Sequence, residues 1–200
     1  MARLGMVIDL KRCIGCHSCT IACKSEHCTP PEVFWGRVLE KEEGKFPSAK
    51  RTFLPVLCNH CKDPACLDAC PTGATSQRAD GIVLVDYNAC MGCRACIAAC
   101  PYTTRTFTKE VRQYYPAELT PFEKVGYQEF QGGVVTKCTF CVERVESGLE
   151  PACVQTCLTN ARYFGDLDDP KSKVSQLIRE RYSFTLLPEA GTNPSVYYLT

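Results

Sequence analysis

The chain lacks the long hydrophobic segments that mark membrane-spanning or exported proteins. Its 200 residues contain no stretch close to the roughly 20 apolar residues that a transmembrane helix needs. The longest clearly apolar run is Ile82–Val85, and the N-terminal segment MARLGMVIDLKRC has no apolar core of signal-peptide length. We therefore expect no direct membrane span, and any attachment to a membrane would go through a partner.

Nucleotide-binding fingerprints and a charge of one sign are also missing. No G-x-G-x-x-G or P-loop pattern occurs, so the chain offers no site for a flavin or nucleotide. The 23 Lys and Arg residues nearly balance the 22 Asp and Glu residues, for a formal net charge of +1. This balance gives no case for nucleic-acid binding.

Cysteine, in contrast, is abundant, with 17 residues in the chain. The odd number and the repeated two-residue spacings argue against a disulfide framework and favour thiols gathered around metal. Sixteen of the cysteines form four groups, each ending with a three-residue gap. The groups are Cys13, Cys16, Cys19 and Cys23; Cys58, Cys61, Cys66 and Cys70; Cys90, Cys93, Cys96 and Cys100; and Cys138, Cys141, Cys153 and Cys157.

The third group reads CMGCRACIAACP, which is the run that holds a [4Fe-4S] cluster in bacterial ferredoxins. Zinc is the rival metal, because paired C-x-x-C units also form zinc ribbons. The first and third groups speak against zinc, since each has a third cysteine after two more residues. Group four is the loosest, with 11 residues between Cys141 and Cys153, and would be ambiguous alone.

An internal repeat extends the assignment to all four groups. The segment VIDLKRCIGCHSCTIAC (7–23) aligns without gaps on LVDYNACMGCRACIAAC (84–100). The segment DPACLDACPTGA (63–74) aligns on EPACVQTCLTNA (150–161). Such a repeat indicates a duplicated two-cluster unit and therefore four [4Fe-4S] clusters. Sixteen bound thiolates and four oxidised cluster cores would bring the net charge to about −7.

The inner groups predict their own ligand pairing. Only 19 residues separate Cys70 from Cys90, and Ala-Asp-Gly at 79–81 is a turn signal between two strand-like runs. In two-cluster ferredoxins the fourth cysteine of each run ligates the cluster of the other run. The predicted inner sites are site C (Cys58, Cys61, Cys66 and Cys100) and site D (Cys90, Cys93, Cys96 and Cys70).

The same crossing rule pairs the outer groups across the length of the chain. The predicted outer sites are site A (Cys13, Cys16, Cys19 and Cys157) and site B (Cys138, Cys141, Cys153 and Cys23). An alternative pairs group one with group two and group three with group four. Its linkers are too long for a short hairpin, but the alternative stays open on the sequence alone.

The predicted fold class is α+β, with two tandem-nested, bacterial-ferredoxin-like units that each hold two clusters. Residues 1–50 and 133–200 would form the outer unit and residues 51–105 the inner unit. Residues 106–132 would be an inserted, aromatic-rich loop and a candidate partner interface.

Local patterns place the secondary structure. Short helices are expected to follow the third cysteine of each run, as in CIAAC and CTIAC, and strands are expected at Gly5–Asp9, Ala74–Gln77 and Ile82–Asp86. A C-terminal helix is expected to begin at Asp169 as N-cap and to run to about Arg181. The final segment, 188–200, is expected to be an extended tail.

Residues in the cluster loops have weaker signals. His17 and His60 could donate to cluster sulfurs, or could be loop histidines that face solvent. Arg94 and Lys62 could favour the reduced clusters, or could be solvated charges. Cys28 is left without a group, and Trp35 reads as core packing.

Four complete cysteine groups leave no iron with an open position for a substrate, so the chain is not an enzyme on its own and is expected to relay electrons. The motifs resemble the four-cluster iron–sulfur subunit of complex iron–sulfur molybdoenzymes, which include polysulfide, thiosulfate, arsenate and dimethyl sulfoxide reductases. The resemblance covers the four cysteine groups in order, GDLDDPKSKV (165–174) and the tail LPEAGTNPSVYYL (187–199).

The resemblance implies a catalytic partner that carries a molybdenum or tungsten bis-pterin cofactor, and often a quinone-reactive membrane anchor. It also implies the nested pairing of sites A to D. Co-export with a signal-bearing partner would place the complex on the periplasmic face of the cytoplasmic membrane rather than in the cytoplasm. The alternatives are a polyferredoxin-type carrier or subunit of a hydrogenase or other dehydrogenase, and a structural zinc module.

Overall fold

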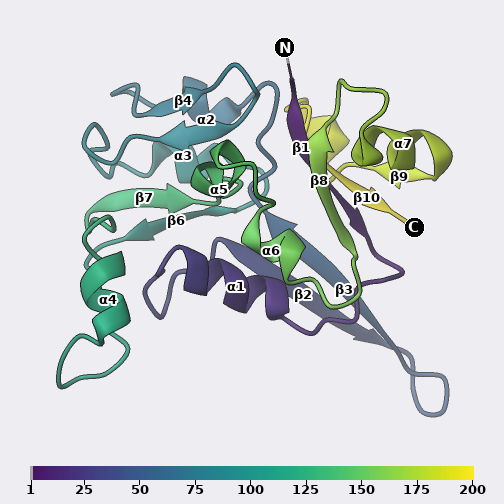
Figure 1. Ribbon diagram of the computed structural model, residues 1–200, viewed down its shortest axis with the longest axis horizontal. Helices are drawn as coiled ribbons and strands as arrows, with labels where there is room; N and C mark the ends of the chain where they lie inside the picture. Colours follow the sequence, from purple (N-terminus) through teal and green to yellow (C-terminus); the bar gives the residue numbers. More distant parts are fainter. Residues whose placement is uncertain (1) are drawn as a thin grey trace.

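The two ends of the chain meet in one mixed sheet. In the computed structural model, which describes residues 2–200, strand β1 (Leu4–Asp9) pairs antiparallel with β8 (Arg162–Asp166) and parallel with β10 (Val196–Leu199). Strand β9 (Ser183–Phe184) completes the order β8-β1-β10-β9, as Figure 1 shows. The apolar run of β1 is fully buried because the strand is central and both of its faces are covered.

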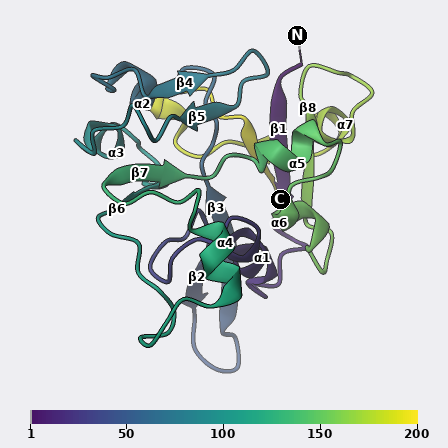
Figure 2. The ribbon, with the colours of Figure 1, turned by 60° about the vertical axis from the view of Figure 1, so that its left-hand side comes forward.

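The final segment, 188–200, is less extended than the sequence predicts. It contains a short 3₁₀ turn (Pro188–Ala190) before β10 enters the sheet beside β1. Between the turn and β10, the chain runs along the inner cysteine loops, where Lys62 N donates to Asn193 O at 2.8 Å and Ser195 N donates to Asn59 O at 2.9 Å. Figure 2 shows this yellow segment passing beside α2 and β5.

Helix α7 (Lys173–Glu180) covers one face of this sheet, and its start corrects the sequence prediction. The N-cap is Ser172, whose hydroxyl accepts a hydrogen bond from Ser175 N at 3.2 Å. Asp169 instead accepts from Lys171 N in the preceding turn, at 2.8 Å. Both residue types can cap a helix, and the contact of the Ser172 hydroxyl with the Asp166 carbonyl on β8 favours the later start.

Short helices lie at the third cysteine of every group, and they begin slightly earlier than predicted, before the cysteine rather than after it. They are α1 (Ser18–Glu26), α2 (Ala65–Asp68), α3 (Ala95–Ala98) and α6 (Ala152–Gln155), and each begins one residue before that cysteine. Helix α1 packs on α6, and α2 packs on α3. The helices of the outer groups therefore lie together, as do those of the inner groups.

The hairpin between groups two and three is also confirmed. Strands β4 (Thr75–Gln77) and β5 (Val83–Val85) pair antiparallel, and Gly81 in the connecting turn has a φ of +84°. This conformation favours glycine because it has no Cβ to clash with the backbone.

Two further hairpins were not anticipated. Strands β2 (Gly36–Glu43) and β3 (Lys50–Leu57) form one that spans the junction between residues 1–50 and 51–105. Strands β6 (Arg105–Thr108) and β7 (Val134–Lys137) form the other and bracket the 106–132 segment. That segment also contains helix α4 (Pro121–Gly126), which a Thr120–Glu123 capping box begins.

One main core connects these elements. Trp35 is buried in it, as predicted, and its Nε1 donates to Thr136 Oγ1 at 3.0 Å. Helix α5 (Val142–Glu146) follows Cys141 at the edge of the core. Among residues 2–200, no helix combines the length and the apolar character needed to cross a bilayer.

Candidate metal centres

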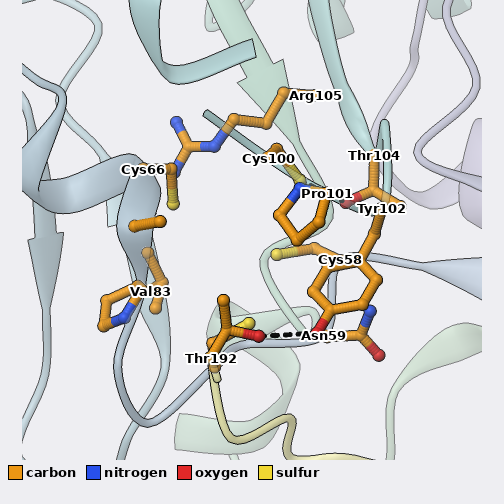
Figure 3. A pocket seen from close by; sticks show the side chains of 13 residues that line it. Cys58, Asn59, Cys66, Val83, Cys100, Pro101, Tyr102, Thr104, Arg105 and Thr192 are labelled. Atoms are coloured by element: carbon orange, nitrogen blue, oxygen red, sulfur yellow. Dashed lines mark hydrogen bonds between the residues drawn. The ribbon is translucent and has the colours of Figure 1, made fainter. Parts of the chain in front are cut away.

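Three hollows in the structure are each lined by four cysteines. Cys58, Cys61, Cys66 and Cys100 line one of them, shown in Figure 3. A second is lined by Cys13, Cys16, Cys19 and Cys157. A third is lined by Cys70, Cys90, Cys93 and Cys96. In every hollow, three cysteines come from one group, and the fourth is the last cysteine of another group.

The remaining four cysteines also lie together. Burial raises the pKa of Cys138 well above its usual value, and the neighbouring Cys23, Cys141 and Cys153 raise it further. Burial raises the pKa of Cys141 to about 12 as well, with Cys153 adding to the effect. These thiols are therefore neutral in the absence of metal, and binding metal would release their protons.

The cysteine loops depend on residues that accept a left-handed backbone. Gly15 and Gly92 take the same place in groups one and three, with φ of +68° and +70°. A Cβ on Gly92 would lie 2.2 Å from the carbonyl oxygen of Gly133, so the loop requires glycine for space as well as for conformation.

The donor set fits a thiolate-ligated cluster better than a single ion. Within residues 2–200, no group of three or more His, Cys, Asp or Glu side chains could hold one metal ion. The three hollows have no carboxylate among their lining residues, and all 17 cysteines are free. Four cysteine sulfurs around one hollow, an arrangement that occurs three times, match the Cys₄ ligation of [4Fe-4S] clusters.

Two buried arginines reach the cysteine sulfurs, and sequence reasoning missed both. Arg162 donates to Cys19 Sγ at 3.4 Å and to Cys153 Sγ at 3.7 Å. Arg105 donates to Cys66 Sγ at 2.9 Å and points toward it in Figure 3. Each follows the last cysteine of its group by five residues and begins a strand. This shared offset is the signal that could have revealed them.

His60 is not the solvent-facing loop residue that the sequence left as an alternative. It is fully buried, its Nδ1 accepts a hydrogen bond from Val83 N at 3.0 Å, and its ring stacks on Phe140 with centroids 3.8 Å apart. Burial lowers the pKa of His60 well below its usual value, and the nearby Lys137 lowers it further, so the ring is neutral.

The other loop residues have ordinary roles. His17 pairs with Glu40 at 2.7 Å on the surface, and its bonded partner is not a cysteine. Arg94 is exposed and stacks over the ring of Phe107 at 3.9 Å. Cys28 is buried and contacts helix α4.

A different histidine reaches a cysteine. His27 Nε2 lies 3.2 Å from Cys141 Sγ, and its ring packs against Trp35. The position directly follows helix α1 and carries no motif, so the sequence offers no signal for it.

The tail completes one of the hollows. Thr192 lies in the wall that Figure 3 shows, and its hydroxyl makes a 2.5 Å hydrogen bond with the hydroxyl of Tyr102. Asp63 N donates to Thr192 O at 3.1 Å. Residues near the C-terminus thus help to bury the sulfurs of the inner groups.

Sequence comparisons agree with this geometry. The profile of the family described as 4Fe-4S dicluster domain matches residues 49–115 and 105–167. A selenate reductase subunit from Mesobacillus selenatarsenatis is 44% identical over an alignment of 210 residues, which covers 98% of this chain and 71% of the relative. The arsenate respiratory reductase iron–sulfur subunit of a Shewanella species is 42% identical over an alignment of 224 residues, which covers 98% of this chain and 96% of the relative. A sulfite dehydrogenase subunit from Allochromatium vinosum is 39% identical over an alignment of 221 residues, which covers 100% of this chain and 83% of the relative.

The cysteine sites and the family match define a 4Fe-4S protein of the electron-transfer class, like the iron–sulfur subunits that it resembles. The chain belongs to the family of iron–sulfur subunits of molybdoenzyme-type respiratory oxidoreductases, the family of dimethyl sulfoxide reductase.

Proposed function

We propose that the chain holds four [4Fe-4S] clusters, with the ligand sets of sites A, B, C and D. The observation that carries this proposal is the lining of the three hollows, each with the fourth cysteine of a different group. When bound, each cluster can take up and release one electron. The domain division follows the same logic, with residues 1–50 and 133–200 around sites A and B and residues 51–105 around sites C and D.

The four sites would form a row in the order A, B, C, D. Arg162 touches Cys19 of site A and Cys153 of site B. Cys58 of site C is among the neighbours that, after burial, raise the pKa of Cys138 in site B. Arg105 touches Cys66 of site C. It also lies near Cys96 of site D, where burial raises the pKa of the Cys96 thiol and the Arg105 charge lowers it. Sites A and D are then the two ends of the row.

At the ends of this row, apolar side chains are exposed in the cysteine loops. Ile14 in the site A loop is 57% exposed and Met91, at the same place in the site D loop, is 66% exposed. Exposed apolar side chains beside a redox site suit protein contacts. We infer that both ends dock onto partner proteins.

The partners would be a catalytic subunit with a molybdenum or tungsten bis-pterin cofactor and, at the other end, a quinone-reactive membrane anchor or another redox protein. Attachment to the membrane would be peripheral, on the periplasmic face. One relative is named as part of a selenate reductase and another as part of a sulfite dehydrogenase. Reduction and dehydrogenation are opposite directions, so the direction of electron flow depends on the catalytic partner.

Metal analysis of anaerobically purified protein tests the cluster content. We expect about 16 irons and about 16 acid-labile sulfides per chain. Zinc in place of iron would contradict the proposal and support the structural zinc module. Copurification of the native complex, followed by assay for molybdenum and tungsten, distinguishes the molybdoenzyme partner from a hydrogenase.

Cysteine variants test the pairing. In the nested arrangement, Cys100→Ala removes the same electron paramagnetic resonance (EPR) signal as Cys61→Ala. In the alternative arrangement, it removes the same signal as Cys141→Ala, because group three would then pair with group four.

A further inference from the structure

Three buried cations lie inside the protein, and each is at a different junction in the row of sites. They are Arg162, Lys137 and Arg105, with relative exposures of 5%, 2% and 5%. Among the ion pairs of residues 2–200, none involves these three side chains. A buried cation without a carboxylate is costly unless another negative charge lies nearby.

The two arginines occupy matching positions. Arg162 bonds to Cys19 and Cys153, which are the third cysteines of groups one and four. Arg105 bonds to Cys66 and also lies against Cys96, the third cysteines of groups two and three. Each guanidinium therefore sits between the two sites of one unit.

Lys137 occupies the junction between the two units. Its Nζ donates to the carbonyl oxygen of Cys138, a ligand of site B, at 2.8 Å, and to the carbonyl oxygen of Val83. Val83 lines the hollow of site C. Position 57, which corresponds to Lys137 before group two, is a leucine, so this cation has no partner in the repeat.

A thiolate-ligated cluster becomes more negative by one charge when it is reduced. A fixed cation nearby favours that added charge, and the effect is strong where water is excluded. Because each cation lies between two sites, it should act on both. Arginine is suited to this place since it stays protonated in any surroundings.

We propose that Arg162, Lys137 and Arg105 set the reduction potentials of the neighbouring sites in pairs, A with B, B with C, and C with D. This inference rests on the four clusters proposed above. It assigns to each cation a joint effect on two clusters rather than a contact with one.

The test is an EPR-monitored redox titration of the full-length protein in its native complex. Arg162→Met should lower the midpoint potentials of two clusters, A and B, each by at least about 59 mV, a tenfold change for a one-electron couple. Arg105→Met should instead lower the midpoint potentials of clusters C and D, and Lys137→Met should lower those of clusters B and C. Cys61→Ala and Cys141→Ala assign the signals of sites C and B, and Cys16→Ala and Cys93→Ala assign those of sites A and D.

Arg162→Lys and Arg105→Lys keep the charge and should hold the potentials close to those of the wild type. Arg179→Met is the matched control, because Arg179 is an exposed arginine on α7 that donates to the Pro170 carbonyl. It should leave all four potentials unchanged.

The inference is wrong if each neutral variant shifts a single cluster, all four clusters equally, or none. Where a methionine variant loses iron, Arg162→Gln and Arg105→Gln provide second neutral variants. The inference also fails if Arg162→Lys or Arg105→Lys, with full iron content, shifts the midpoint potentials as far as the corresponding methionine variant does. The charge would then not be the cause of the shift. A wild-type protein with fewer than four clusters would instead contradict the proposed function.

Discussion

Replacing Tyr198 tests whether the C-terminal segment is an integral part of the core. Tyr198 lies on β10, is fully buried, and donates its hydroxyl to the carbonyl oxygen of Pro55 on β3 at 2.8 Å. Its ring stacks on Phe184 with centroids 5.6 Å apart. Burial raises the pKa of Tyr198, which keeps the hydroxyl protonated and able to donate.

Two substitutions separate the hydroxyl from the ring. Tyr198→Phe leaves a buried carbonyl without this partner and should cost about 1–2 kcal/mol. Tyr198→Ala removes the ring as well and should cost about 3–5 kcal/mol, the range for a large side chain lost from a core. These costs are a large part of the roughly 5–15 kcal/mol that separates most folded domains from their unfolded states.

The assay is a rate, because a protein that loses its clusters on unfolding does not refold reversibly. Loss of the visible cluster absorbance in guanidinium should be about 5- to 30-fold faster for Tyr198→Phe if the bond is broken in the transition state for unfolding. Tyr198→Ala should be at least about 100-fold faster. Tyr197→Phe is the control, since the Tyr197 hydroxyl makes no hydrogen bond within the part of the chain that the structure describes. Equal rates for Tyr197→Phe and Tyr198→Phe would refute the reasoning.

Three further predictions concern a cysteine loop, a partly buried ion pair and the cysteine outside the four groups. Gly92→Ala should disrupt site D and lower the iron content from about 16 to about 12 per chain. Gly73→Ala is the control, because Gly73 also has a positive φ of +67° but has open space around it. It should lower the free energy of unfolding by only about 1–2 kcal/mol. Burial raises the pKa of Asp9, but the ion pair with Arg181 lowers it, and the net effect is a lowered pKa. The pair therefore stabilises the fold at neutral pH, and this stability is lost as the pH falls through the pKa of Asp9. The difference in unfolding rate between the wild type and Arg181→Met should therefore be largest at neutral pH and shrink on acidification; a constant difference would contradict it. Cys28→Ser should leave iron content and all EPR signals unchanged, and loss of any signal would assign Cys28 to a cluster.

Much of the local structure was predictable because its causes are local. The cysteine spacings predicted the short helices at the third cysteine of each group, and the turn residues at 79–81 predicted the β4–β5 hairpin. Three of the four predicted cysteine sets line hollows in the structure, which supports the proposed pairing of ligands. Errors arose where two local signals compete, as at the start of α7, where Asp169 and Ser172 both carry the chemistry of an N-cap.

The amino-acid sequence by itself determined the kind of protein this is, because metal ligands and their spacing are written in residue identity. Only the tertiary structure decided that β10 lies beside β1, since the partners are almost the whole chain apart. It also decided which of the 23 Lys and Arg residues lose water and come to lie between cysteine sites. Arg105, Lys137 and Arg162 look like surface charges in the sequence, and burial, a property of the packed fold, gives them their electrostatic effect.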